Sequence, residues 1–428
     1  MNNLYIGTFD CEKFWEYDNA KLPKIQDKQA DNCILGMDEL LIYLGDNQDK
    51  LLTRFKIDEV QTDYLKKLGF NKMCFSYEDF SSEMLFDSSQ EICTLMTVSS
   101  FNLKHFVRNN DCLTPFSVLK NTHTFAKKYN LNGKFPDLKV VENVNSKFFS
   151  AAVSYDLGLH QQINLAFSVD EMANIGEKLL HGGAFLIKEE YGVSGKGNLL
   201  VDSQEKLACI LKYLGKQEKQ GKKIRFLMEP FMHKDKDFST QFTITEKGVI
   251  QFESVQILIN NAFSYKSSIA ANSSFIELLI KNRYFEKIRE VGQKLYKAGY
   301  FGSVCIDSML LKDGHIYEVV EINARMSMSY IKHRLDMKYE KLPNRYFTYY
   351  NFKIPPTFSY ENFLDKMDKN GILFHGNRGI LPLTSKMMTI NRKKESSYKG
   401  RLYALTVGAE DLTDKLRDVA ASLNMKLL

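Results

Sequence analysis

A β-hairpin near residue 313 constrains this chain more than any other feature of its sequence. The dipeptide Asp313-Gly314 favours the tight turn of a two-stranded hairpin, because such turns require backbone angles that these residue types accept. Strongly apolar stretches, 304–311 and 316–323, lie on either side of the turn. The chain therefore contains a predicted antiparallel strand pair, and the register of that pair decides where its acidic residues lie.

Oxygen-bearing side chains gather at the open end of this hairpin. Asp307 and Glu321 are about equally far from the turn, so strand pairing brings them close together, and side-chain alternation puts Glu321 and Asn323 on one face. Two carboxylates and an amide oxygen suit Mg²⁺, or Mn²⁺, that also contacts phosphates. Arg325 adds a fork of N–H donors for a phosphoryl group in transfer. The alternative is a polar edge hairpin with solvated acids; the apolar neighbours of these acids favour an enclosed site.

A glycine-rich loop follows a second apolar strand. Lys188 ends the predicted strand 183–188, and the loop that follows contains Gly192, Ser194, Gly195 and Gly197. Glycine tolerates positive φ and has no side chain, so such a loop can bring backbone N–H groups close to an anion. The spacing matches neither a Walker A loop nor GxGxxG. It predicts a flexible flap over phosphates, with a surface hairpin as the alternative.

A third motif is a strand that ends in an acid. The predicted strand 224–228 is followed by Glu229 and a charged linker that reaches Asp237. Glu229 and backbone groups of the linker are placed to meet an adenine edge, and Asp237 to accept hydrogen bonds from ribose hydroxyls. An ordinary strand followed by a charged loop is the alternative.

The hydrophobic pattern elsewhere alternates between helices and short strands, which places the chain in the α/β class. At about 150 residues per domain, its 428 residues allow two to three domains. We predict an N-terminal α/β domain over 1–112, a central domain over 113–340 and a small C-terminal α/β appendage over 341–428. Further elements are predicted as a helix capped by Asp170, a helix opening at Asp202, strands at 198–201, 238–245, 249–257 and 401–407, and a helix at 286–299.

Composition excludes several classes of protein. The chain is 44% hydrophobic and 26% charged, and it has no apolar run long enough to span a membrane and no secretory signal pattern. Its seven cysteines are scattered without a CxxC pair, which is typical of reduced thiols in the cytoplasm. A net charge of +6 over this length does not indicate nucleic acid as a partner. The sequence makes no prediction of oligomeric state.

Taken together, the order and spacing of these motifs resemble the ATP-grasp ligase superfamily over roughly residues 110–330. Asn145-Ser146-Lys147 opens a helix ahead of Lys188, and the remaining motifs follow in the family's order. The resemblance implies an ATP-grasp fold, in which two α+β subdomains clamp ATP. Many relatives also carry an arginine shortly before the metal-binding aspartate, whereas residues 303–306 of this chain include no base.

The resemblance also implies a role for each matching residue. Lys188 and Arg325 are implied to act in catalysis, with Arg325 on the reacting phosphoryl group. The others are implied to bind ATP and magnesium: Lys147, Lys188, Gly192, Ser194, Gly195 and Gly197 at the phosphates, Glu229 with the backbone of Phe231 and Met232 at the adenine, Asp237 at the ribose, and Asp307, Glu321 and Asn323 at Mg²⁺.

Within the superfamily, the chain is most similar to amino-acid and peptide ligases of bacterial natural-product pathways. Three stretches carry this similarity: KEEYGVSGKGNLLV, EINARMSMS and GRLYALTV. It implies activation of an amino-acid carboxylate, glutamate in the narrowest form, as an acyl-phosphate with release of ADP. The acceptor is then an amine or the phosphopantetheine thiol of an acyl carrier protein.

Several alternatives stay open at this point. They are a peptide ligase acting on free amino acids, a small-molecule kinase of the same fold, and a nucleotide-binding module without catalysis. An acidic carrier would need a basic docking surface. A basic cluster that suits this role, with a solvated loop as the alternative, consists of Lys386, Arg392, Lys393, Lys394, Lys399 and Arg401.

Overall fold

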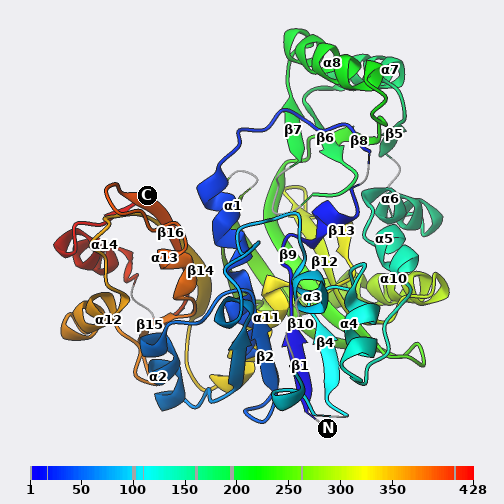
Figure 1. The fold of residues 1–428 in the computed structure, drawn as a ribbon. Helices are drawn as coiled ribbons and strands as arrows, with labels where there is room; N and C mark the ends of the chain where they lie inside the picture. Colours follow the sequence, from blue (N-terminus) through cyan, green and yellow to red (C-terminus); the bar gives the residue numbers. More distant parts are fainter. Residues whose placement is uncertain are drawn as a thin grey trace.

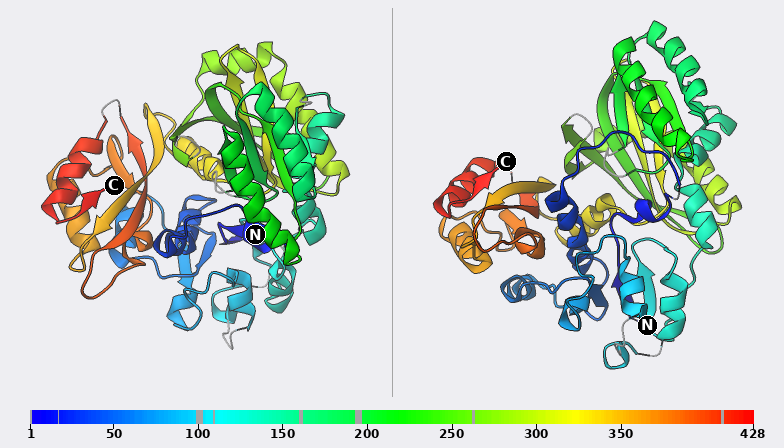
Figure 2. Two further views of the ribbon diagram at one scale, coloured as in Figure 1. Left: turned by 90° about the horizontal axis from the view of Figure 1, so that it is seen from above. Right: turned by 45° about the horizontal axis from the view of Figure 1, so that its top comes forward.

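Three β-sheets organise the described part of the chain, each flanked by helices (Figures 1 and 2). A computed structural model describes residues 2–16, 18–98, 103–108, 110–159, 162–192, 197–261, 264–408 and 411–428. The predicted α/β class is confirmed, because one sheet is wholly parallel and the other two are antiparallel. No helix among the described residues is both long and apolar enough to cross a lipid bilayer.

The N-terminal sheet is parallel, with the strand order β3-β2-β1-β4. Its strands are β1 (Asn3–Ile6), β2 (Lys50–Thr53), β3 (Met73–Ser76) and β4 (Cys112–Pro115). Because β1 lies between β2 and β4, the loops that leave β1 and β4 start side by side at one edge of the sheet. The main helices of this part are α1 (Lys28–Leu35), α2 (Glu59–Lys67), α3 (Ile92–Val98) and α4 (Thr122–Lys128).

The central sheet has nine strands and contains the predicted hairpin. Its order is β13-β12-β9-β10-β11-β14-β16-β15, and β17 pairs with β14. Strands predicted at 238–245, 249–257 and 401–407 are all present here. The strands are β9 (Lys234–Ile244), β10 (Ile250–Asn261), β11 (Ser264–Ala270), β12 (Gly302–Leu311), β13 (Ile316–Asn323), β14 (Arg345–Ile354), β15 (Gly379–Pro382), β16 (Tyr398–Val407) and β17 (Lys426–Leu427).

Helices complete the layers around this sheet. The predicted helix at 286–299 is α10 (Tyr284–Lys297), and its apolar residues Ile288, Val291 and Leu295 are fully buried. Part of the opposite face is covered by α11 (Met328–Lys338), which follows the hairpin directly. The remaining helices of this part are α9 (Ser273–Lys281), α12 (Tyr360–Lys369), α13 (Lys386–Thr389) and α14 (Thr413–Ser422).

A small antiparallel sheet with its own core forms the third part, at the top of Figure 1. Its order is β5-β8-β6-β7. It consists of β5 (Asn164–Ala166), β6 (Phe185–Glu189), β7 (Asn198–Val201) and β8 (Phe226–Pro230), with α7 (Val169–Gly182) and α8 (Gln204–Lys219) packed on it. Two short helices, α5 (Leu138–Val144) and α6 (Lys147–Asp156), lead into it from the N-terminal part.

The predicted caps of α7 and α8 are wrong by one or two residues. Ser168, rather than Asp170, caps α7, and Ser203, rather than Asp202, caps α8. Each serine hydroxyl accepts a hydrogen bond from the backbone N–H three residues later. Aspartate and serine are both good N-caps, so the residue type alone does not decide between neighbouring positions.

Residues 18–24, here called the strap, tie the small sheet to the N-terminal part. Figure 1 shows this dark-blue segment running from α1 toward β6 and β8. The Ala20 N–H donates to the carbonyl of Lys223 at 2.8 Å, and the side chains of Ala20 and Leu22 join the small core. Glu189, at the end of β6, accepts from the Leu22 N–H at 2.8 Å and from Lys24 Nζ at 2.7 Å. The small sheet is therefore held from the N-terminal side as well as through α6.

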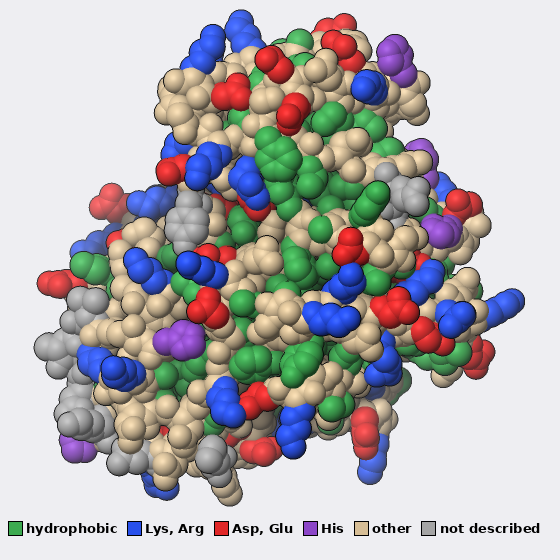
Figure 3. Space-filling view, turned by 90° about the vertical axis from the view of Figure 1, so that its right-hand side faces the viewer, with side chains coloured by type: hydrophobic (Ala, Val, Ile, Leu, Met, Phe, Trp, Pro, Cys, Tyr) green, Lys and Arg blue, Asp and Glu red, His purple; other side chains and the backbone are tan. Residues whose placement is uncertain are grey.

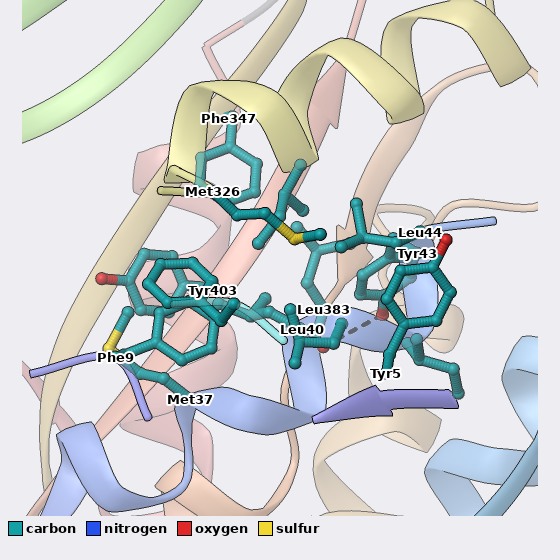
Figure 4. Close-up of a cluster of buried hydrophobic side chains, with 14 of the residues drawn as sticks. Tyr5, Phe9, Met37, Leu40, Tyr43, Leu44, Met326, Phe347, Leu383 and Tyr403 are labelled. Carbon is teal, nitrogen blue, oxygen red and sulfur yellow. Dashed lines mark hydrogen bonds between the residues drawn. The ribbon is translucent and has the colours of Figure 1, made fainter. Parts of the chain in front are cut away.

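The last part of the chain packs on the N-terminal sheet and extends the central one. Strand β14 pairs with β11, so residues from 345 onward continue the same sheet. Figure 4 shows the apolar cluster at this junction, in which Leu40, Phe347, Leu383 and Tyr403 are all buried. The Tyr43 hydroxyl donates to the Leu383 carbonyl at 3.0 Å within this cluster.

Charges are mixed on the face drawn in Figure 3. Lysine and arginine side chains alternate there with aspartate and glutamate, and hydrophobic side chains lie between them. This face therefore presents no continuous stripe of one sign.

Replacing Tyr43 with Phe should destabilise the junction between the first and last parts of the chain. The change leaves the buried Leu383 carbonyl without its donor, a loss of about 1–3 kcal/mol. Urea unfolding of Tyr43→Phe and the wild type measures the difference. Tyr155→Phe removes a hydroxyl from a side chain that is 73% exposed and is the matched control. Equal unfolding midpoints for both variants would contradict a stabilising role for this bond.

Candidate active site

The hairpin brings the predicted metal-binding side chains together. Asp307 on β12 pairs directly with Glu321 on β13, and Cys305 pairs with Asn323. The Asn323 amide donates to Asp307 Oδ2 at 3.2 Å. The register inferred from the Asp313-Gly314 turn is therefore confirmed, although a bulge interrupts the pairing between Asp307 and Met309.

Asp307 occupies an environment that opposes its negative charge. Burial, together with the neighbouring Glu321 carboxylate, raises the pKa of Asp307 to about 7. The Asp237 carboxylate, near the start of β9, raises the pKa of Asp307 further. Two partly buried carboxylates side by side favour a bound cation, because a cation offsets both the repulsion and the lost hydration.

Lys147 approaches this pair from α6. Its Nζ donates to Glu321 Oε1 at 2.8 Å, and its side chain is only 4% exposed. Ser146 caps the helix and donates its hydroxyl to Glu190 at 2.8 Å. Glu190 Oε1 also accepts a hydrogen bond from Arg225 Nη2 at 2.7 Å, which fixes the Glu190 side chain directly after β6. The predicted helix start at Asn145-Ser146-Lys147 is confirmed, and it fixes Lys147 against the hairpin.

Asn145 clamps the backbone just beyond the hairpin. Its Oδ1 accepts from the Ala324 N–H at 2.8 Å, and its Nδ2 donates to the Ala324 carbonyl at 3.3 Å and to that of Val141 at 2.8 Å. Ser150 Oγ accepts from the Ile322 N–H at 3.2 Å. The residues on both sides of Asn323 are therefore fixed by the α5–α6 segment.

Arg325 meets a partner that the sequence did not suggest. Its Nε donates to Glu12 Oε1 at 2.8 Å, and its Nη2 contacts the same oxygen. Nη2 also donates to Asn323 Oδ1 at 2.9 Å. Burial opposes the positive charge of Arg325, but the Glu12 carboxylate keeps the pKa of the guanidinium above its ordinary value. Glu12 lies 313 residues away in sequence, in the short 3₁₀ helix Cys11–Phe14 after β1, so no local pattern could identify it.

Lys188 and Glu229 form a buried ion pair within the small sheet. The Lys188 ammonium contacts Glu229, and the two side chains are 5% and 9% exposed. The Tyr317 hydroxyl on β13 donates to Glu229 Oε2 at 3.4 Å. Lys188 is therefore connected, through Glu229 and Tyr317, to the strand that carries Glu321. The sequence predicted both charged residues at the site but assigned them to different parts of the nucleotide.

The residues assigned to adenine and ribose already have partners. The Phe231 N–H donates to the Ala184 carbonyl at 2.9 Å. Met232 follows directly after β8 in the same linker. Asp237 accepts from Asn260 Nδ2 at 2.6 Å and also contacts Lys234.

Gly192 and Gly197 frame the glycine-rich loop, whereas Ser194 and Gly195 lie outside the described residues. Gly197 has φ +105°, and a Cβ there would lie 2.9 Å from Glu189 Oε2. Its carbonyl accepts from the Glu189 N–H at 2.8 Å. Position 197 therefore requires glycine, because any other residue type would meet both strain and a clash.

The donor set fits Mg²⁺ that is completed by phosphate oxygens. Within the described ranges, no three His, Cys, Asp or Glu side chains cluster as a complete metal site. Three carboxylates, of Glu12, Asp307 and Glu321, face the two cations Lys147 and Arg325. One negative charge is left over when Asp307 is ionised, and Mg²⁺ commonly binds through one or two carboxylates plus substrate phosphates.

Residues 303–306, which contain no basic side chain, include a cysteine. Cys305 lies on the same face as Asp307, is buried, and its Sγ accepts from Gln241 Nε2 at 3.5 Å. Burial raises the pKa of the Cys305 thiol to about 12. This position therefore supplies no positive charge for a substrate carboxylate.

No model of a known protein family matches the chain. Among curated proteins, it is 23% identical over 312 residues to the butirosin acyl-carrier protein–L-glutamate ligase of Niallia circulans, covering 71% of this chain and 68% of that protein. The biotin carboxylase domain of Hydrogenobacter thermophilus 2-oxoglutarate carboxylase, solved with MgADP, ADP and bicarbonate, matches with a TM-score of 0.54 and 14% identity over 100% of this chain and 90% of that one. The L-amino acid ligase of Bacillus licheniformis matches with a TM-score of 0.52 and 14% identity over 100% and 98%.

These solved structures are ATP-grasp proteins, so the ATP-grasp fold predicted from the sequence is confirmed. The resemblance to ATP-grasp ligases is confirmed as well. The roles of individual residues stay predictions.

Replacing Asn145 with Ala should loosen the backbone between Asn323 and Arg325. The Ala324 N–H is buried and loses its acceptor, so stability should fall by about 1–3 kcal/mol. Thermal unfolding and hydrogen exchange at Ala324 measure the effect. Asn143→Ala, at an exposed position of α5, is the matched control. Unchanged exchange at Ala324 in Asn145→Ala would show that this clamp is unimportant.

Proposed function

We propose that this protein is an ATP-dependent carboxylate ligase that activates its substrate as an acyl-phosphate and releases ADP. The observation that carries the proposal is the partly buried pair Asp307–Glu321, with Lys147 bonded to Glu321 and Arg325 bonded to Asn323. This arrangement offers oxygen ligands to a divalent ion and cations to phosphate groups in one enclosed place. The names of the similar proteins agree with a ligase.

In this proposal each charged group has a simple task. Asp307, Glu321 and Asn323 hold Mg²⁺, which neutralises charge on the phosphates. Lys147 and Lys188 bind phosphate oxygens of ATP, and Lys188 exchanges its contact with Glu229 for one of them. Because these groups are fixed before ATP binds, most of the acceleration comes from positioning and electrostatic stabilisation.

Arg325 would hold the transferred phosphoryl group and the acyl-phosphate formed from it. It would do so through its permanent positive charge and through the one Nη1 hydrogen that Glu12, Asn323 and Met326 leave unused among the described residues. The adenine then lies against the linker after β8, with Glu229 and the backbone of Phe231 and Met232, and the ribose lies near Asp237. The glycine-rich loop bounded by Gly192 and Gly197 lies beside the phosphates.

The substrate proposed is an amino acid, with L-glutamate as the most specific choice. The acceptor proposed is an amine or the phosphopantetheine thiol of an acyl carrier protein. The support is the similarity to the butirosin acyl-carrier protein–L-glutamate ligase, which extends over two thirds of both chains. Coupling of the activated acid to a free amino acid or peptide would indicate a peptide ligase. A stable phosphorylated product would indicate a kinase, and ATP binding without turnover would indicate a non-catalytic module.

The predicted basic cluster is smaller than the sequence suggested. Lys386 pairs with Glu78, Lys399 pairs with Asp27, and Arg401 donates to Asn351. Arg392 donates to the Phe358 carbonyl at 2.7 Å. Only Lys393 and Lys394 of the cluster are exposed without a contact among the described residues, so they are the pair to test for carrier docking.

Glu321→Gln should abolish magnesium-dependent turnover and leave the fold intact. The change removes one partly buried carboxylate that is paired with Lys147, and loss of a metal ligand costs on the order of 10²–10³ in rate. The assay follows ADP and phosphate released from ATP with pooled amino acids, with and without a phosphopantetheinylated carrier. Glu318→Gln is not a suitable control because Glu318 is buried, whereas Glu340→Gln alters an exposed acid. Release of AMP and pyrophosphate by the wild type would contradict an acyl-phosphate mechanism.

Replacing Lys393 and Lys394 together with Ala should weaken only carrier-dependent coupling. Loss of two steering charges should raise the carrier KM about three- to tenfold at low salt and less at high salt. The double change Lys216→Ala with Lys219→Ala, on α8, is the matched control. A carrier KM equal to that of this control would exclude a docking role for the pair.

A further inference from the structure

We propose that Glu12 is a positioning residue for Arg325, an inference that rests on the proposed function. Glu12 comes from the N-terminal part of the chain, where it follows β1 in the 3₁₀ helix Cys11–Phe14. It is 5% exposed and holds the guanidinium by its edge. Glu12 is not part of any of the sequence motifs that carry the resemblance to ATP-grasp ligases.

The hydrogen bonds of Arg325 define its orientation almost completely. A guanidinium has five N–H donors. Nε and one Nη2 hydrogen go to Glu12, the second Nη2 hydrogen goes to Asn323 Oδ1, and one Nη1 hydrogen goes to the Met326 carbonyl. Four donors are thus used among the described residues, and one Nη1 hydrogen remains for a ligand.

Glu12 is itself fixed on its other side. Its Oε2 accepts from the Cys11 thiol at 3.4 Å, while Oε1 receives both bonds from Arg325. Phe116, in the loop after β4, covers the guanidinium with its ring centroid at 5.7 Å. The Phe116 carbonyl also accepts from the Met326 N–H at 3.0 Å. The loops that leave β1 and β4 side by side therefore hold Arg325 together.

Glu12 also keeps Arg325 away from the metal-binding acids. Arg325 already influences the charge of Asp307, and Glu321 influences that of Arg325, so the three groups lie within electrostatic reach. Without Glu12, a buried guanidinium would seek another carboxylate, because a buried unpaired charge is costly. Glu321 and Asp307 are the two acids already within electrostatic reach of Arg325. Glu12 thus orients Arg325 and leaves two carboxylates available to Mg²⁺.

The test is a double-mutant cycle between positions 12 and 325. Glu12→Gln keeps the shape of the side chain but loses its charge. It should lower kcat about 10- to 100-fold, change the ATP KM less than about threefold, and raise the Mg²⁺ concentration needed for half-maximal rate. In the Arg325→Ala background, the same change should alter kcat less than about twofold, because its target is gone.

The controls separate positioning from folding. Glu12→Asp keeps the charge and should retain more activity than Glu12→Gln. Glu16→Gln, nearby in sequence and paired with Lys21, should leave kcat unchanged. An equal loss of kcat from Glu12→Gln in both backgrounds would overturn the proposal, because Glu12 would then act without Arg325. Unfolding midpoints exclude variants that do not fold.

A spectroscopic readout does not depend on turnover. The buried Arg325 Nε–H, bonded to a carboxylate, should give a slowly exchanging, downfield NMR signal, assigned by its loss in Arg325→Lys. Glu12→Gln should shift this signal upfield and speed its exchange, even if no substrate is turned over. An unmoved signal would overturn the positioning role, whereas a moved signal with an inactive wild-type protein would contradict only the ligase proposal.

Discussion

The pairing of Asp307 with Glu321 across one strand register is the contact on which the candidate site depends. Two carboxylates held together in a buried place repel each other and lose hydration, and burial of an acid without compensation costs several kcal/mol. The pKa of Asp307 is raised because burial and the Glu321 carboxylate both disfavour its charged form. Compensation has to come from cations placed with precision, and the surrounding elements provide two of them, Lys147 and Arg325.

Different parts of the chain hold these two cations in place. Lys147 is set by the start of α6, where Ser146 and Glu190 connect the helix to the small sheet. Arg325 is set by Glu12 from the loop after β1. The strap runs on from that same N-terminal segment to Glu189. The candidate site on one hairpin is thus assembled by residues from all three parts of the chain.

The parts of this structure that the sequence predicted are those encoded by short-range patterns. The Asp313-Gly314 turn fixes a register, so the proximity of Asp307, Glu321 and Asn323 follows from counting residues. The strand predicted to end at Lys188 follows from its local hydrophobic pattern, whereas the helix start at Lys147 was implied by the resemblance to ATP-grasp ligases. Cap positions were wrong by one or two residues, since serine and aspartate compete for the same role.

Contacts between distant segments could not be predicted in this way. Glu12 and Arg325 are separated by 313 residues, and nothing near Glu12 marks it as a partner of a buried arginine. Lys188 can pair with Glu229 because β6 and β8 are antiparallel neighbours in the small sheet. The sequence of either strand alone does not indicate which strand lies beside it. The continuation of the central sheet into β14 likewise depends on a β11–β14 pairing with only two matched residues.

The three cations that the proposal assigns to phosphates are each paired with a carboxylate: Lys147 with Glu321, Lys188 with Glu229, and Arg325 with Glu12. Such pairs keep the long cationic side chains ordered inside the protein, and each pair as a whole carries no net charge. They differ in one respect. In the proposal, Glu321 is also a ligand of Mg²⁺, and an oxygen shared with a divalent ion would bind Lys147 less strongly. Glu12 has no such second role in the proposal, so its pairing with Arg325 would persist. The same kind of contact would then give one cation whose release is coupled to metal binding and one whose position stays fixed.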